Sequence, residues 1–350
     1  MIFGSDNWAG GASQINQALS KGAAGLASAY EMSDLDQRVK KKFCEIFETE
    51  CSVFYVATGT AANSLAIASA MRPGGVTFCH NEAHLKESEG SAPEFASGGG
   101  RLVLVDGDDA KINPAALKKI AKDYPPTFNH LGQGTMVSIT QTTEGGTVYS
   151  LNEIDAISEV ARANELVLHM DGARFANALV DLDCSPAEMT WKRGVDMVSF
   201  GATKNGCWCA EALVVFDKSL ATQIEFIRKR MGHLFSKARF VSLQFEAYFE
   251  DDLWLELARH SNSIGIKLAE MVEHSPNVRL AWPSKTNQVF FFADTNKAEK
   301  WAAAGARFHP FPVPKALAGT TAENEGMYRL VASFIATEKD VADLKAVFAT

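Results

Sequence analysis

The sequence predicts an α/β protein in which a large sheet domain is followed by a smaller α+β domain. Helical and strand patterns alternate along the chain, as is typical of a sheet covered by helices. Beyond Pro276 the strands become shorter, so we place a soft boundary near residue 250, between a large domain with an N-terminal arm (residues 1–250) and a small domain (residues 251–350). Hydrophobic residues make up 47% and charged residues 22% of the 350, which excludes a disordered, collagen-like or coiled-coil chain.

Caps and apolar spacing predict the helices. Ser33 is a candidate N-cap, and apolar residues recur after it at every fourth position, as on the buried face of a helix. Ser150 and Glu153 have the spacing of a capping box. Apolar positions from about Arg239 to Glu273 predict one long helix. The expected helices are residues 33–47, 64–71, 150–164, 239–273 and 339–348.

Short runs of apolar and β-branched residues predict the strands. The expected strands are residues 137–140, 166–171, 195–200, 212–216, 278–282, 288–293 and 328–334. Open α/β sheets bind their ligands at the carboxyl ends of the strands. Residues that directly follow these runs are therefore the first candidates for a functional site.

Charge and cysteine content narrow the class of protein. The net charge of -8, from 34 basic and 42 acidic residues, argues against a nucleic-acid partner. No apolar run reaches the ~20 residues that span a bilayer, and the first residues lack the basic flank and apolar core of a signal peptide. Six cysteines without a paired framework predict a reduced, cytoplasmic protein. Cys207 and Cys209 are expected to be structural thiols, and no metal site is expected.

The segment Thr58-Gly-Thr-Ala-Ala-Asn63 lies just before the helix expected at 64–71. Gly59 would let the backbone approach an anion, while Thr60 and the N–H groups at the helix start could hydrogen-bond phosphate oxygens. Small residues also open helices for packing reasons, so this segment alone does not establish a phosphate site.

Four further side chains are candidates for the site. Asp171, in His169-Met-Asp-Gly-Ala-Arg174, could pair with a protonated ring nitrogen, or it could cap the next helix. Arg174 could take a carboxylate through two parallel bonds. Lys204 lies in a turn of small residues, which suits an amine that forms a Schiff base with a carbonyl cofactor, although most lysines in turns are only solvated. His84 could stack on a planar ring or be a surface histidine.

The order of these features matters more than any one of them. A phosphate turn, a histidine, a strand-end aspartate and then a lysine match the plan of a pyridoxal-phosphate enzyme. This cofactor needs a lysine for its carbonyl carbon and an acidic partner for its ring nitrogen.

The chain resembles the threonine aldolase and β-eliminating lyase family of fold-type I pyridoxal-phosphate enzymes. Within that family it is most similar to low-specificity L-threonine aldolases and phenylserine aldolases. The His169–Arg174 segment together with Thr203-Lys-Asn-Gly206 is specific, and the other segments are supportive. The supporting segments are Gly4-Ser-Asp-Asn7, residues 58–63, Ala83-His84 and Arg228-Lys-Arg-Met-Gly232. The resemblance implies a transferase-like large domain with a central, mostly parallel sheet.

The resemblance also implies how the cofactor, pyridoxal 5'-phosphate, would be held. Lys204 would bind it covalently, and Asp171 would pair with its ring nitrogen. Gly59 and Thr60 would bind the phosphate, and His84 would stack on the ring face.

For the substrate, the resemblance implies a second set of residues. Ser5, Arg174 and Arg329 match positions that bind the α-carboxylate. Arg174 is expected to contact the cofactor as well as the substrate. His130 falls near a second active-site histidine of the family and is a candidate base for the β-hydroxyl proton, although this alignment is looser. Family members are usually homotetramers, dimers of dimers that share active sites between subunits.

The implied activity is retro-aldol cleavage of L-threonine or L-allo-threonine to glycine and an aldehyde, by a carbon–carbon lyase of amino acid metabolism. Cleavage of phenylserine to glycine and benzaldehyde, and β-elimination or dehydration of hydroxyamino acids, remain open alternatives. A non-catalytic regulator or scaffold is disfavoured, because Asp171, Arg174, Lys204 and Arg329 are all present.

Overall fold

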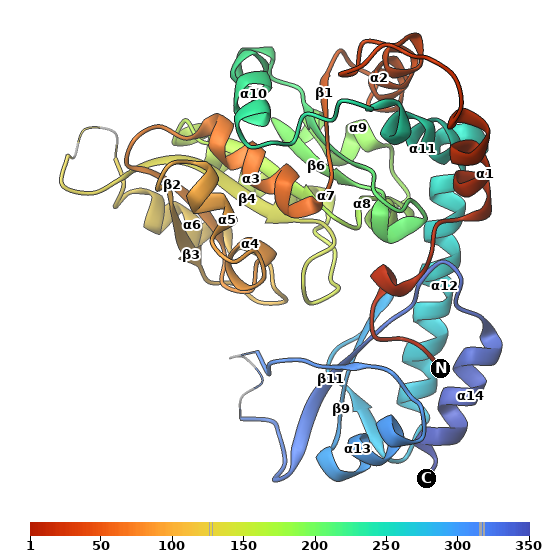
Figure 1. Ribbon diagram of the computed structural model, residues 1–350. Helices are drawn as coiled ribbons and strands as arrows, with labels where there is room; N and C mark the ends of the chain where they lie inside the picture. Colours follow the sequence, from red (N-terminus) through yellow and green to blue (C-terminus); the bar gives the residue numbers. More distant parts are fainter. Residues whose placement is uncertain (126, 128, 315–316, 318) are drawn as a thin grey trace.

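A seven-stranded sheet forms the centre of the large domain in the computed structural model, which describes residues 1–125, 127, 129–314, 317 and 319–350 (Figure 1). The strand order is β1-β7-β6-β5-β4-β2-β3, and β7 runs antiparallel to the other six strands. The strands are β1 (Ser52–Val56), β2 (Gly75–His80), β3 (Arg101–Val105), β4 (Gln133–Thr140), β5 (Val167–Gly172), β6 (Met197–Gly201) and β7 (Glu211–Val215). The α/β class and the mostly parallel sheet are confirmed.

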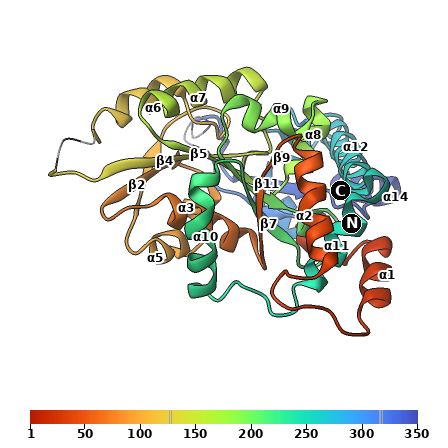
Figure 2. The same cartoon turned by 90° about the horizontal axis from the view of Figure 1, so that it is seen from above.

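Both faces of this sheet are buried under helices, as a parallel sheet requires. Figure 2 shows α6 and α7 along one face and α3 and α10 along the other. Alternate strand residues divide between two apolar clusters: Tyr55 packs with Phe200 in one, and Phe54 with Leu213 in the other. The helices up to β7 are α1 (Ser13–Gly22), α2 (Asp34–Ile46), α3 (Gly59–Ala70), α4 (His84–Glu87), α5 (Ala92–Ala96), α6 (Pro114–Ala121), α7 (Leu151–Ala163), α8 (Phe175–Leu182) and α9 (Pro186–Met189).

The helix starts were predicted from the right side chains. Ser33 and Asp36 form a capping box on α2, and Ser150 and Glu153 form the predicted one on α7. Thr58 caps α3, which begins at Gly59 rather than at residue 64. Single-turn 3-10 helices are η1 (Asp6–Trp8), η2 (Trp191–Arg193), η3 (Thr203–Asn205) and η4 (Glu250–Asp252).

The prediction of a single long helix over residues 239–273 is wrong. The chain forms α11 (Arg239–Phe249) and α12 (Leu253–Glu273), with η4 between them. Asp251 and Asp252 have φ angles of 50° and 55°, which belong to the left-handed region and interrupt a right-handed helix. The apolar pattern continues across this break because both helices bury a face, so periodicity alone did not reveal it.

A four-stranded antiparallel sheet, ordered β10-β11-β9-β8, forms the small domain. Helix α10 (Lys218–Arg230) covers the large sheet. The elements of the small domain are β8 (Val278–Leu280), β9 (Gln288–Asp294), α13 (Thr295–Ala303), β10 (His309–Pro310), β11 (Glu325–Val331) and α14 (Glu338–Phe348). Phe291 of β9 packs with α12 and α14 on one face of the sheet, whereas Phe290 and Phe292 lie in a separate cluster on the other face.

Two long-range connections join the domains. Helix α12 places Trp254 in the large-domain cluster and Leu268 in the small-domain cluster. The N-terminal arm reaches the small domain, where Phe3 is fully buried in the same cluster as Leu268. Because these segments belong to both regions, the division near residue 250 stays a proposal. None of the helices in the described ranges is long and apolar enough to cross a bilayer.

We predict that Phe43→Ala lowers the free energy of unfolding by about 3–5 kcal/mol, as burial of a large aromatic side chain implies. Phe43 is fully buried, and its ring centroid lies 5.3 Å from that of Phe200, 5.0 Å from that of Phe245 and 4.9 Å from that of Phe249. Urea unfolding monitored by circular dichroism measures the change. Phe95→Ala, at an exposed position, is the control and should change stability by less than about 0.5 kcal/mol. Equal effects of the two changes would contradict the prediction.

Candidate active site

The predicted residues that follow strands converge at one edge of the large sheet. Asp171 is near the carboxyl end of β5, and Lys204 follows β6 in η3. Strands β5 and β6 are parallel neighbours, with Asp171 opposite Ser199. The same edge receives the end of β1 and the start of α3.

Asp171 is buried, and protein donors hold both of its carboxylate oxygens. The backbone N–H of Ala173 donates to Oδ1 at 3.0 Å, and the side-chain amide of Asn63 donates to Oδ2 at 2.8 Å. These donors fix the orientation of the carboxylate, and each oxygen retains a lone pair for a further donor. A protonated ring nitrogen is such a donor.

Lys204 lies in a turn that its neighbour anchors. The amide of Asn205 donates to the Tyr248 hydroxyl at 2.7 Å and to the Trp254 carbonyl at 2.8 Å. The turn ends at Gly206, whose φ of 114° only glycine adopts readily. Within the described part of the chain, Lys204 forms no ion pair, so its amine is not committed to a carboxylate.

Glu211 is a buried carboxyl beside this turn that the sequence analysis missed. The Thr203 N–H donates to its Oε1 at 3.2 Å. Burial raises the pKa of Glu211 to about 7, against the lowering effects of the Thr203 hydrogen bonds and the Lys204 charge. An acidic residue at the start of the apolar run 212–216 was the signal available in the sequence.

The start of α3 can receive an anion. The Thr58 side chain accepts the N–H of Ala61 at 3.1 Å, while the first N–H groups of a helix have no partner inside it. A Cβ added at Gly59 would meet no atom within 4 Å, so the space in front of the helix is open. In this 12-residue helix the dipole adds to the attraction of a phosphate.

His84 begins α4, and its side chain is 33% exposed. Its Nδ1 lies 2.8 Å from Oε1 of Glu89, a carboxylate whose side chain is fully enclosed. The hydrogen bond to Glu89 raises the pKa of His84, although burial opposes it. The imidazole is therefore held at one nitrogen, and the other is not part of this bond.

Arg174 holds a carboxylate through two bonds, as its sequence position suggested, but the carboxylate is that of Asp6. Nε donates to Asp6 at 2.7 Å and one terminal nitrogen donates at 3.0 Å, with both side chains buried. Burial favours the neutral form of Asp6, yet Arg174 outweighs it and keeps the pKa of Asp6 below its usual value. Asn287 of the small domain also donates to Asp6, at 3.1 Å.

Arg329 and Ser5 lie on the small-domain side. Arg329 belongs to β11, its guanidinium lies 5.7 Å from the Phe311 ring centroid, and its buried Nε lacks a hydrogen-bond partner among the described residues. Burial and the charge of Arg174 lower the pKa of Arg329. Ser5 caps η1, where its hydroxyl accepts the Asn7 N–H at 3.1 Å.

The structure does not bring His130 to this group. His130 is exposed in the segment that precedes β4, whose first residue is Gln133. Asp171 pairs with Thr140 at the opposite end of that strand. Spacing along the sequence suggested proximity, but the length of β4 separates the two ends of the sheet.

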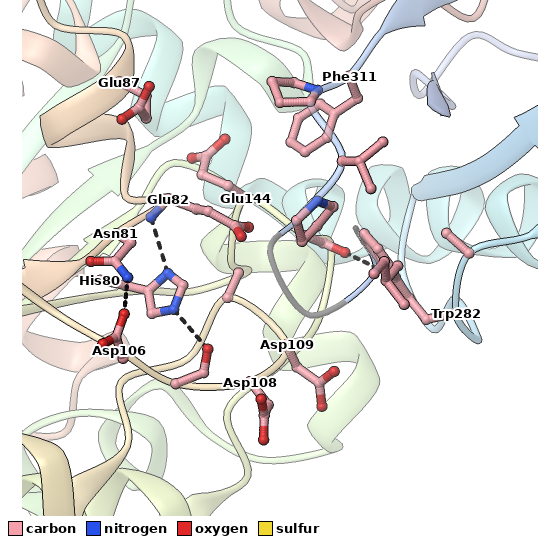
Figure 3. Close-up of a pocket in the computed structure, with 18 of the residues that line it drawn as sticks. His80, Asn81, Glu82, Glu87, Asp106, Asp108, Asp109, Glu144, Trp282 and Phe311 are labelled. Atoms are coloured by element: carbon pink, nitrogen blue, oxygen red, sulfur yellow. Dashed lines mark hydrogen bonds between the residues drawn. The ribbon is translucent and has the colours of Figure 1, made fainter. Parts of the chain in front are cut away.

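A cleft of about 1240 Å³ adjoins the site between the two domains. Figure 3 shows Glu82 and Glu144 among the acidic side chains of the large domain, with Trp282 and Phe311 of the small domain on the other wall. His84 and Glu144 line this cleft, whereas Lys204 and Asp171 do not. The cleft meets the candidate site at His84, and the charge of Glu144 on its wall acts on His84, Arg174 and Arg329.

These side chains fit pyridoxal phosphate. An uncommitted amine, a buried carboxylate with lone pairs to spare and an open helix start are the three groups that the cofactor needs. Among the described residues no cluster of three or more histidine, cysteine or acidic side chains could hold a metal ion.

Comparisons with known proteins point in one direction. The family model for beta-eliminating lyases matches residues 3–296. The chain is 39% identical to a low specificity L-threonine aldolase of Pseudomonas aeruginosa, over 88% of this chain and 89% of that protein. A similar enzyme of Candida albicans is 25% identical over 78% and 71% of the two chains. The solved threonine aldolase of Leishmania major superposes with a TM-score of 0.90 at 26% identity, covering 99% and 98%.

We predict that Glu211→Gln stabilises the protein at alkaline pH relative to the wild type. A carboxyl whose folded pKa lies near 7 rather than at the usual 4.5 favours folding while protonated, and this contribution is lost as the pH rises from about 4.5 through 7. The glutamine keeps the acceptor for Thr203 but never ionises. The stability difference, variant minus wild type, should grow by about 3 kcal/mol between pH 4 and pH 8. Urea unfolding of the cofactor-free proteins at both pH values measures it, and a constant difference would refute the assignment.

Proposed function

This chain belongs to the beta-eliminating lyase family, and from that premise we propose that it is a pyridoxal-phosphate-dependent aldolase. Its substrates would be L-β-hydroxy-α-amino acids, L-threonine and L-allo-threonine among them, which it would cleave to glycine and an aldehyde. The observation that carries the proposal is the meeting of Lys204, Asp171 and the α3 start at one sheet edge, in a chain similar to threonine aldolases.

In this proposal Lys204 would bind the carbonyl carbon of the cofactor, Asp171 would pair with the ring nitrogen, and His84 would lie on the ring face. Gly59 and Thr60 would bind the phosphate through the helix start. When bound, pyridoxal phosphate withdraws electrons from the substrate Cα, so that a bond to that carbon can break. The anchored carboxylate of Asp171 supports this role, because two protein donors hold it in place and leave lone pairs for the N–H of the ring.

Arg329 would be the principal ligand of the substrate carboxylate, with Ser5 and Arg174 beside it. The buried Nε of Arg329 supports this assignment, since it needs an acceptor. Arg174 already uses two nitrogens on Asp6, so its contribution would be its charge and its remaining nitrogen. Holding the carboxylate on one side orients the Cα–Cβ bond for cleavage and contributes through positioning.

The proton of the β-hydroxyl needs a base. Two histidines line the cleft, and both ring nitrogens of His80 lie within hydrogen-bond distance of backbone groups, of Glu82 and Gly107. His84 uses only Nδ1 in its bond to Glu89, so we assign the proton to its Nε2 or to a water that it orders. His130 keeps a catalytic role in this proposal only if a neighbouring subunit supplies it, as the family's shared active sites imply.

We also propose a homotetrameric, cytoplasmic enzyme. Exposed Leu26, Tyr30 and Met32 on the segment after α1 support an oligomeric face, since large apolar side chains rarely gather on a free surface. All six cysteines are free thiols, which suits a reducing compartment. Phenylserine remains a second candidate substrate, because Trp282 and Phe311 give the cleft an aromatic wall.

We predict that the protein supplied with pyridoxal phosphate and L-threonine forms glycine and acetaldehyde, and that Lys204→Ala abolishes this. Borohydride reduction followed by mass spectrometry should locate the cofactor on the peptide containing Lys204. Lys339→Ala, an exposed control, should retain both activity and labelling. Ammonia with 2-oxobutyrate would indicate elimination instead of aldol cleavage, and labelling at another lysine would refute the role of Lys204.

We predict that Arg329→Ala lowers kcat/KM for L-threonine by about 10–100-fold, chiefly through KM, because a charged hydrogen bond to the carboxylate is lost. Arg329→Lys keeps the charge but loses the planar guanidinium, so its kcat/KM should lie between those of the wild type and Arg329→Ala. Steady-state kinetics measure both variants. An unchanged KM in Arg329→Ala would remove Arg329 from the carboxylate site.

A further inference from the structure

A chain of buried hydrogen bonds joins His84 to Asp171. The side-chain nitrogen of Asn63 lies 2.8 Å from Oδ2 of Asp171 and 2.8 Å from Oε1 of Glu89. The same Glu89 oxygen lies 2.8 Å from Nδ1 of His84. In the sequence Asn63 stands out only as part of the phosphate turn, and nothing local distinguishes Glu89 from the other acidic residues.

The carboxylate of Glu89 lies in an unusual environment. Its side chain is fully enclosed, and its Oε2 lacks a hydrogen-bond partner among the described residues. Such burial costs free energy unless the charge is compensated. His84 and Asn63 provide that compensation on a single oxygen, so the geometry directs the carboxylate towards these two residues.

Nearby charges act on both Glu89 and His84 in this series of hydrogen bonds. Burial raises the pKa of Glu89, Asp171 raises it further, and His84 and Asn63 lower it. His84 feels the negative charges of Glu89, of Asp171 on β5 and of Glu144 after β4, all of which favour its protonated form, while burial disfavours that form.

Building on the function proposed above, we propose that Glu89 is the positioning residue for His84, and that Asn63 links this pair to Asp171. Glu89 accepts the proton-bearing Nδ1 of His84, which leaves Nε2 as the nitrogen that can take a proton from the cleft. When Nε2 gains that proton, the imidazolium is paired with the Glu89 carboxylate. The buried aspartate of a serine hydrolase triad orients its histidine by the same physics.

Asn63 adds the coupling. Its NH₂ group has two hydrogens, and one carboxylate takes each. Asp171 and the Glu89–His84 pair therefore share one donor, so a change in charge at either end acts on the other.

The wild-type enzyme itself provides the first test, by nitrogen NMR of the cofactor-loaded protein labelled with ¹⁵N-histidine. The His84 signal is assigned by its loss in His84→Gln. Neutral His84 should carry its proton on Nδ1, and its pKa should lie above the ordinary value. A proton on Nε2 in neutral His84 would overturn the proposal, and this measurement requires no variant of Glu89 to fold.

Glu89→Gln is the second test, because it keeps the acceptor oxygen and removes the charge. The pKa of His84 should fall by about one unit or more, and the acid limb of the pH profile of kcat/KM should move down with it. Glu87→Gln, on α4 at an exposed position, makes the same charge change without a contact to His84 and should leave the titration unmoved.

The two readouts separate this proposal from the aldolase assignment. The NMR titration does not depend on turnover, so Glu89 can be tested even if L-threonine is not cleaved. If Glu89→Gln leaves the His84 pKa at the wild-type value, Glu89 only fills space and the proposal fails. If the pKa falls while threonine is not a substrate, the positioning role stands and the proposed reaction fails.

Discussion

The carboxylate of Asp6 is the interaction on which the arrangement of the site depends. It lies on the N-terminal arm, yet it holds Arg174 of the large domain and Asn287 of the small domain at once. A buried ion pair costs much of what it gains, because both charges leave water. What it provides here is geometry: the arm, the end of β5 and the start of β9 are fixed at a common point beside the candidate carboxylate site.

The strand order provides the second constraint. Strands β4, β5 and β6 are parallel neighbours, so their carboxyl ends deliver side chains to one edge. A buried polar group also connects these strands. Buried His169 lies between Ser138 and Ser199, with ring nitrogens 2.8 Å and 2.9 Å from their hydroxyls, and burial lowers its pKa to about 4. It therefore serves as a neutral connector of three strands.

Sequence reasoning succeeded where the signal was local. Strand-end Asp171, the turn with Lys204 and the caps of α2 and α7 are each encoded within a few residues. It failed where the partner is distant, because Asp6 and Arg174 are 168 positions apart and Asn63 and Asp171 are 108 apart. Distances along the chain also misled, as with His130, since they do not say at which end of a strand a residue lies.

Helix α12 has a mechanical consequence for the cleft. It runs without interruption from Leu253 to Glu273, and it is anchored in the large-domain cluster at one end and in the small-domain cluster at the other (Figure 1). Because this helix has no kink, it fixes the separation of the large-domain and small-domain walls of the cleft. Differences in ligand size would then be absorbed by side chains on those walls. Phe290 and Phe292 lie behind the aromatic wall in a cluster of their own, so that wall could be reshaped while the core around Phe291 stays intact.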